Sequence, residues 1–98
     1  MNTSNLLVVN VTQKHINKGK RDNSSSCPIA LALHDVIDNS EKFEFVRAIH
    51  VEEDIVRLFA QFGGPVVFPL TRRAQTFVHK FDEGGRKAVK PTTFKFTL

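Results

Sequence analysis

The stretch from Thr71 to Glu83 constrains the fold most, because its apolar residues recur at the spacing of an α-helix. They stand at positions i, i+3, i+4 and i+7 and are Ala74, Phe77, Val78 and Phe81. This spacing places them on one side of a helix. Thr71 suits the N-cap position, and Gly84 suits the position after the last turn. A helix with one apolar side must bury that side against another element.

Strand patterns elsewhere in the chain supply the partner layer. In the segment from Thr92 to Leu98, Phe and Leu alternate with Thr and Lys, as in a strand with one buried face. Asn5 to Val11 is a short apolar, β-branched run that reads as a buried strand. Phe43 to Val51 and Asp54 to Phe62 are separated by two glutamates, which indicates a hairpin. A third short strand, Val66 to Pro69, follows a Gly-Gly-Pro turn signal.

Two further helices precede the hairpin. Thr12 is placed to cap a short helix over residues 13–18, and Gly19 to end it. The next helix runs from Pro28 to Asp38, with proline at the first helical position, where its missing N–H costs nothing. The polar residues 18–26 between the two helices predict an exposed, flexible loop.

The resulting order, β-α-α-β-β-β-α-β, predicts the α+β class. We expect a single domain over residues 1–98. Its mostly antiparallel sheet has about five strands, and the two longer helices pack on one face of it. At 98 residues, the chain is near the lower end of lengths that fold without a disulfide or metal.

Cysteine count and hydropathy bear on the compartment. One cysteine excludes an internal disulfide, which favours a reducing compartment. No apolar run approaches the roughly 20 residues that cross a bilayer, and the N-terminus lacks the pattern of a signal peptide. We expect a soluble protein of the cytoplasm that does not bind membranes.

Charge is unevenly distributed around a formal net value of +4. By count of side chains, residues 1–26 carry +3, residues 27–70 carry −4 and residues 71–98 carry +5. A polyanion would therefore contact the two ends of the chain rather than its middle.

Cys27 stands where a polar run meets the helix that begins at Pro28. A helix N-terminus stabilises a thiolate, and His15 or His34 would serve as a base if the fold brought one of them close. A cysteine-dependent enzyme centred on Cys27 is therefore one hypothesis. The competing interpretation is a structural cysteine that starts the helix and packs, and we favour it because no second catalytic motif accompanies the thiol.

The same helix start suggests an anion site in the preceding loop. Hydroxyl groups, two cations and the first N–H groups of the helix can cradle a phosphate or carboxylate. The candidate residues are Lys20, Arg21, Ser24, Ser25, Ser26 and Cys27. The glycine spacing of a phosphate-binding loop is missing, so we favour the competing interpretation, a solvated loop.

A basic surface near the C-terminus suggests contact with nucleic acid. The candidate residues are Arg72, Arg73, Lys80, Arg86 and Lys87, and lysines 90 and 95 follow them. The sequence has no Tyr or Trp, and its C-terminal Phe residues occupy apparent core positions. Base stacking would therefore require an exposed Phe.

Metal and cofactor motifs are lacking in the sequence. The four histidines and the cysteine do not have the spacing of a zinc ligand set, so we expect no metal and no cofactor. An unpaired sheet edge suggests a protein partner or a homo-oligomer.

Three segments stand out together: VTQKHINKG, CPIALAL, and FVHKFDEGG followed by PTTFKFTL. They resemble a family of small uncharacterised proteins found in bacteriophages and in phage-rich stretches of bacterial genomes. The matching residues are Thr12, Ile16, Gly19, Cys27, Pro28, Ala32, Phe77, Phe81, Asp82, Gly84, Pro91, Phe94 and Phe96. The resemblance implies a phage-type protein, in the host cytoplasm if phage-encoded, and carries no activity with it.

The leading hypothesis is a small, non-enzymatic accessory protein that binds a protein partner or a small anionic ligand. A nucleic-acid-binding factor and a cysteine-dependent enzyme are the alternatives.

Overall fold

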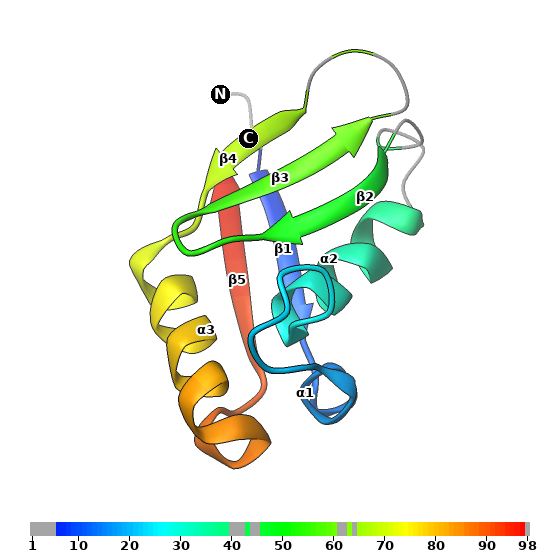
Figure 1. Cartoon of the computed structure of the whole chain (residues 1–98). Coiled ribbons are helices and arrows are strands. Elements are labelled where there is room, and N and C mark those ends of the chain that lie inside the picture. Colours follow the sequence, from blue (N-terminus) through cyan, green and yellow to red (C-terminus); the bar gives the residue numbers. More distant parts are fainter. Residues whose placement is uncertain (1–5, 40–42, 44–45, 61–62, 64, 98) are drawn as a thin grey trace.

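A computed structural model describes residues 6–39, 43, 46–60, 63 and 65–97 (Figure 1). The order of helices and strands and the α+β class are confirmed. The elements are β1 (Leu6–Val11), α1 (Gln13–Lys18), α2 (Pro28–Asp38), β2 (Val46–Val51), β3 (Ile55–Ala60), β4 (Val66–Pro69), α3 (Arg72–Gly84), the 3-10 helix η2 (Gly85–Ala88) and β5 (Thr92–Thr97).

These five strands form two antiparallel sheets rather than one. β1 and β5 pair along their whole length, from Leu6 opposite Thr97 to Val11 opposite Thr92. The other sheet has the order β2-β3-β4. In Figure 1, β1 and β5 run side by side through the middle of the molecule, and the three-stranded sheet lies across one end of them.

The core lies between the buried faces of the two sheets and the helices. Alternate residues of β1 and β5 are buried, including Val9 and Phe96. The two sheets meet where Phe68 of β4 contacts Phe96 of β5, with ring centroids 5.5 Å apart. α3 packs on β5 through an edge-to-face contact between Phe77 and Phe94, at 5.5 Å. α2 packs on β1, so both longer helices lie against the β1–β5 pair.

Polar caps fix the helix starts as the sequence indicates. Thr12 and His15 form a reciprocal capping box at the start of α1. Pro28 occupies the first turn of α2. The hydroxyl of Thr71 accepts a hydrogen bond from the backbone N–H of Ala74 at 3.2 Å. α3 extends one residue beyond the expected end, because the positive φ of 75° falls at Gly85.

Strand boundaries differ more from expectation than helix boundaries. β2 begins at Val46, so Phe43 lies outside the strand, where it is buried; residues 44–45 are outside the described residues. Asp54 belongs to the turn, and the backbone N–H of Glu52 donates to the carbonyl of Ile55 at 2.8 Å. The expected strand ends at 5, 61–62 and 98 also fall outside the described residues. The hairpin itself is confirmed.

Candidate functional site

A groove of about 540 Å³ runs between α3 and the segment that leads from η2 into β5. Both walls follow from local sequence. On α3, the apolar residues Ala74 and Phe77 turn inward, which leaves Arg72, Thr76 and Lys80, each four residues apart, along one outer side. The full lining is Arg72, Arg73, Thr76, Phe77, Lys80, Ala88, Val89, Lys90, Thr92 and Phe94.

Every charged side chain that lines this basic groove is a cation. The charged residues of the lining are Arg72, Arg73, Lys80 and Lys90, and the lining contains no acidic residue. Within the described part of the chain, no hydrogen bond or ion pair joins Arg72, Lys80 or Lys90 to another side chain. Unpaired cations around an enclosed surface attract anions strongly, because the low-dielectric wall focuses their field.

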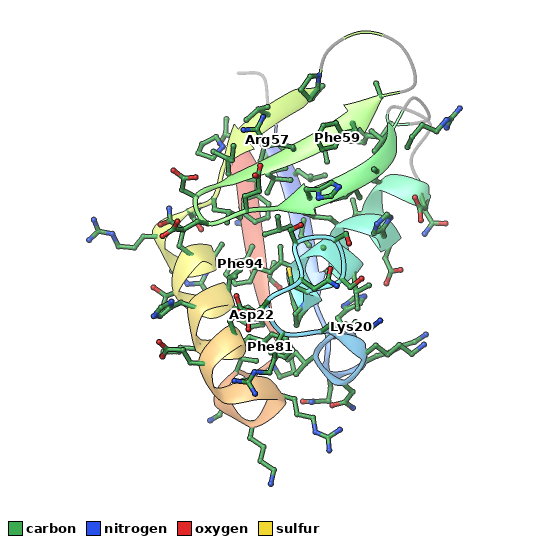
Figure 2. The ribbon with its side chains drawn as sticks, in the orientation of Figure 1. Lys20, Asp22, Arg57, Phe59, Phe81 and Phe94 are labelled. Carbon is green, nitrogen blue, oxygen red and sulfur yellow. The ribbon has the colours of Figure 1, made fainter. Side chains whose placement is uncertain are left out.

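Arg73 differs from the other three cations because the protein holds its guanidinium group in place. One terminal nitrogen donates to the hydroxyl of Thr92 at 2.9 Å, and the other donates to the carbonyl of Thr93 at 3.3 Å. The guanidinium carbon lies over the ring of Phe94, 5.2 Å from its centroid. Figure 2 labels Phe94 beside α3. These contacts fix Arg73 before any ligand arrives.

Three of the five residues predicted to contact nucleic acid meet in the basic groove: Arg72, Arg73 and Lys80. Arg86 and Lys87 lie on η2, exposed and outside the lining. Lys90, which the sequence placed in the same basic surface but not among the five contact residues, lines the wall opposite α3. Its place in the basic run after residue 85 was the only signal in the sequence.

A second pocket, of about 400 Å³, lies on the other side of α3 and reaches the start of α2. Its lining residues are Asp22, Asn23, Ser24, Cys27, Val51, Glu52, Glu53, Gln75, Val78, His79 and Asp82. Four carboxyl groups and no Lys or Arg border this pocket, which disfavours an anion there.

Of the six residues predicted to bind an anion, only Ser24 and Cys27 line this second pocket. The side chain of Arg21 turns to α3 and donates to the carbonyls of Asp82 and Glu83, at 2.8 Å and 2.7 Å.

The other loop residues make contacts within the loop or with β2. Ser24 Oγ lies 3.0 Å from His50 Nδ1, and Ser25 donates to the side-chain oxygen of Asn23. The backbone N–H of Lys20 donates to the carbonyl of Ser26 at 2.9 Å. The anion site in the loop before α2 stays a prediction. The four carboxyl groups that border the neighbouring pocket do not support it.

Cys27 is the N-cap residue of α2 and is 2 % exposed. Burial raises the pKa of its thiol, and the Asp82 carboxylate adds to the increase, while the backbone N–H groups of Ala30 and Ile29 oppose it. At neutral pH the group is therefore a thiol rather than the nucleophilic thiolate.

The histidines considered as bases for Cys27 contact carboxylates instead. His15 Nε2 lies 2.5 Å from Asp35 Oδ2, and His34 Nδ1 lies 3.8 Å from Asp38 Oδ2. His79 borders the same pocket as Cys27, but its ring pairs with Glu83 at 3.0 Å.

Neither a metal-binding cluster nor a membrane span occurs among the described residues. In that part of the chain, no three His, Cys, Asp or Glu side chains are grouped so that they would hold a metal ion. No helix in the described ranges is long and apolar enough to span a bilayer.

Comparison of the chain with protein-family models, with curated proteins and with solved structures gave no match.

Proposed function

We propose that this protein is a non-enzymatic binding protein and that its basic groove binds the phosphate groups of a nucleic acid. The observation that carries the proposal is the lining of the groove, where all charged groups are cations and three of them are unpaired among the described side chains. Phosphate is the anion that such a set of Arg and Lys residues binds most often in proteins.

A nucleic acid fits the surroundings of the groove better than a small anion does. Arg86 and Lys87 continue the positive charge along η2, beyond the groove itself. A small ligand enclosed in the groove would not reach them, whereas a polyanion would. The acidic pocket on the other side of α3 restricts such contact to one side of the molecule.

Salt dependence of binding tests this proposal. We expect the wild-type protein to bind an oligonucleotide at low salt, with log K falling linearly as log salt rises. Replacing Lys80 or Lys90 with Ala should make that slope shallower by about 0.7–0.9 for each phosphate that the variant no longer neutralises. The matched control is Lys14→Ala on α1, which removes an exposed cation away from the groove and should leave the slope unchanged. Equal slopes for all variants would contradict the proposal.

Other proposed roles concern partners and origin. The segments VTQKHINKG and CPIALAL support a phage-type accessory protein, which would act in the host cytoplasm. A protein partner or second copy at a sheet edge is supported by the β1–β5 sheet, which has only two described strands. Leu6 and Val8, exposed at 44 % and 42 %, add apolar side chains on the outer face of β1. Sizing of the purified protein over a range of concentrations tests self-association, and a strict monomer would count against the homo-oligomer.

A cysteine-dependent enzyme is the weakest of these candidates. The buried thiol with its raised pKa disfavours nucleophilic catalysis at Cys27. In addition, both ring nitrogens of His15 already have partners, Thr12 at Nδ1 and Asp35 at Nε2.

A further inference from the structure

We infer that the basic groove recognises an unpaired nucleotide, and that the guanidinium plane of Arg73 is the surface on which its base stacks. The inference rests on the proposed function and adds to it a preference for single strands over duplex. The inference is carried by the contacts that immobilise Arg73. Phosphate binding alone does not require an immobilised guanidinium group.

The first step concerns which flat group is available for stacking. Single-stranded nucleic acids are bound by stacking bases on aromatic rings or on Arg guanidinium planes. The chain has no Trp or Tyr. The two Phe residues in the groove, Phe77 and Phe94, are only 7 % and 1 % exposed. The guanidinium groups of Arg72 and Arg73 are therefore the planar groups that the groove presents to a base, and Arg73 is the one whose plane is held by hydrogen bonds.

The second step concerns preorganisation. A free Arg side chain loses conformational entropy when it stacks on a ligand. Arg73 has already lost much of it, because Thr92 and Thr93 bind its terminal nitrogens and its guanidinium carbon lies over the ring of Phe94. The side chain as a whole remains exposed and lines the groove. A base that stacks on it therefore meets a group that is already held in place.

The third step places the phosphates. Arg72, Lys80 and Lys90 have no partner among the described side chains and border the same groove as Arg73. They are free to neutralise phosphates on either side of the stacked base. A base paired within a duplex cannot turn out onto Arg73 without losing its pairing and stacking.

The experiment compares three probes by fluorescence anisotropy at fixed salt. The probes are a single-stranded oligothymidine of roughly eight nucleotides, an abasic strand of the same length, and a duplex. Wild-type protein should bind the base-bearing strand about tenfold more tightly than the abasic strand, the order of size of one stacked base. Binding of the duplex should be weaker than that of the base-bearing strand.

Arg73→Lys keeps the charge and removes the plane, so it should abolish the preference for the base-bearing strand while leaving the salt slope unchanged. Arg72→Lys is the matched control and should keep the preference, because no ring among the described residues lies under the guanidinium group of Arg72. Thermal unfolding establishes that both variants are folded. If Arg73→Lys does not fold, the base-bearing and abasic probes on wild-type protein still decide the question.

The outcomes separate the inference from the proposed function. Equal binding of base-bearing and abasic strands, with a normal salt slope, would overturn the role of Arg73 and leave phosphate binding standing. A free nucleoside monophosphate that competes fully at low concentration would assign the site to a free nucleotide and overturn the preference for a strand. No binding of any probe at low salt would overturn both proposals.

Discussion

Arg21 donates a hydrogen bond from Nε to the backbone carbonyl of Asp82, at 2.8 Å, across 61 positions of sequence. A second bond runs from its terminal nitrogen to the carbonyl of Glu83. The last carbonyls of a helix lack partners within the helix, and a cation stabilises the negative end of the helix dipole. The loop that precedes α2 is thereby attached to the C-terminal end of α3. The neighbouring Asp22, labelled between α3 and the loop in Figure 2, donates its backbone N–H to Asp82 Oδ1 at 2.9 Å.

We expect Arg21→Lys to lower the free energy of unfolding by about 1 kcal/mol, because the single ammonium nitrogen of Lys does not reproduce the two separate donor nitrogens of the guanidinium group. Urea unfolding at neutral pH measures the change. Lys20→Ala is the control: its side chain is exposed, and only its backbone takes part in the loop. Equal stability of the Lys variant and the wild type would show that this connection contributes nothing.

Gly19→Ala should destabilise the protein through a steric conflict. A Cβ at residue 19 would come within 2.7 Å of the ring carbons of Pro28, a contact that requires the start of α2 to shift. The φ of Gly19 is −66°, so the backbone itself would accept Ala. We expect a loss of about 1–3 kcal/mol in the free energy of unfolding, typical of an overpacked site. Lys14→Ala, in the same short helix, should change stability by less than about 0.5 kcal/mol.

Phe68→Ala tests the contact between the two sheets. Phe68 is 1 % exposed and packs on Phe96, so its removal leaves a cavity and should cost about 3–5 kcal/mol. Phe59→Ala is the matched control on the same sheet. Phe59 is 37 % exposed on the opposite face of the sheet, and Figure 2 labels it beside Arg57. Its replacement should therefore lower the free energy of unfolding clearly less than Phe68→Ala does. Thermal or urea unfolding compares the two; similar losses would mean that the buried face of this sheet is not the one assigned.

Cys27 should react with an alkylating reagent only after denaturation, because the thiol is buried and its pKa is raised. Its titration also affects stability. As the pH rises past the ordinary value of 9.0, the unfolded chain loses the thiol proton first, so the free energy of unfolding decreases until the pH passes the raised value in the folded state.

The measurement is urea unfolding of the wild type and of Cys27→Ala at about pH 8 and about pH 10. The fall in stability between the two pH values should be smaller for the variant. Rapid alkylation of the native protein would contradict the buried position, and an equal pH dependence of both proteins would contradict the raised pKa.

Much of the fold was predictable because its local signals agree with one another. Thr12, Pro28 and Thr71 mark helix starts. Each start depends only on a few neighbouring residues, and all three predicted starts are confirmed. Strand limits were less predictable: Phe43 has the composition of the strand that follows it, but it is buried outside that strand. Burial in the core and pairing in a sheet favour the same residue types, so composition does not separate them.

The candidate site was only half predictable. The cations of α3 could be placed on one outer side from their spacing alone, and Arg72, Arg73 and Lys80 do line one groove. Lys90 and Thr92, which come from the opposite wall, depend on how η2 turns back toward β5. Arg21 was a candidate for an anion site in its own loop, and the structure shows its side chain hydrogen-bonded to the end of α3.

The sequence by itself determined the kinds of elements, their order and which side of each is apolar, because these depend on periodicity and on caps within a few residues. Only the tertiary structure decided that the strands divide into two sheets, that α3 separates a basic groove from an acidic pocket, and that Arg73 is held over Phe94. Those features join residues far apart in the chain, and their contacts arise from the packing of elements, which no local pattern encodes.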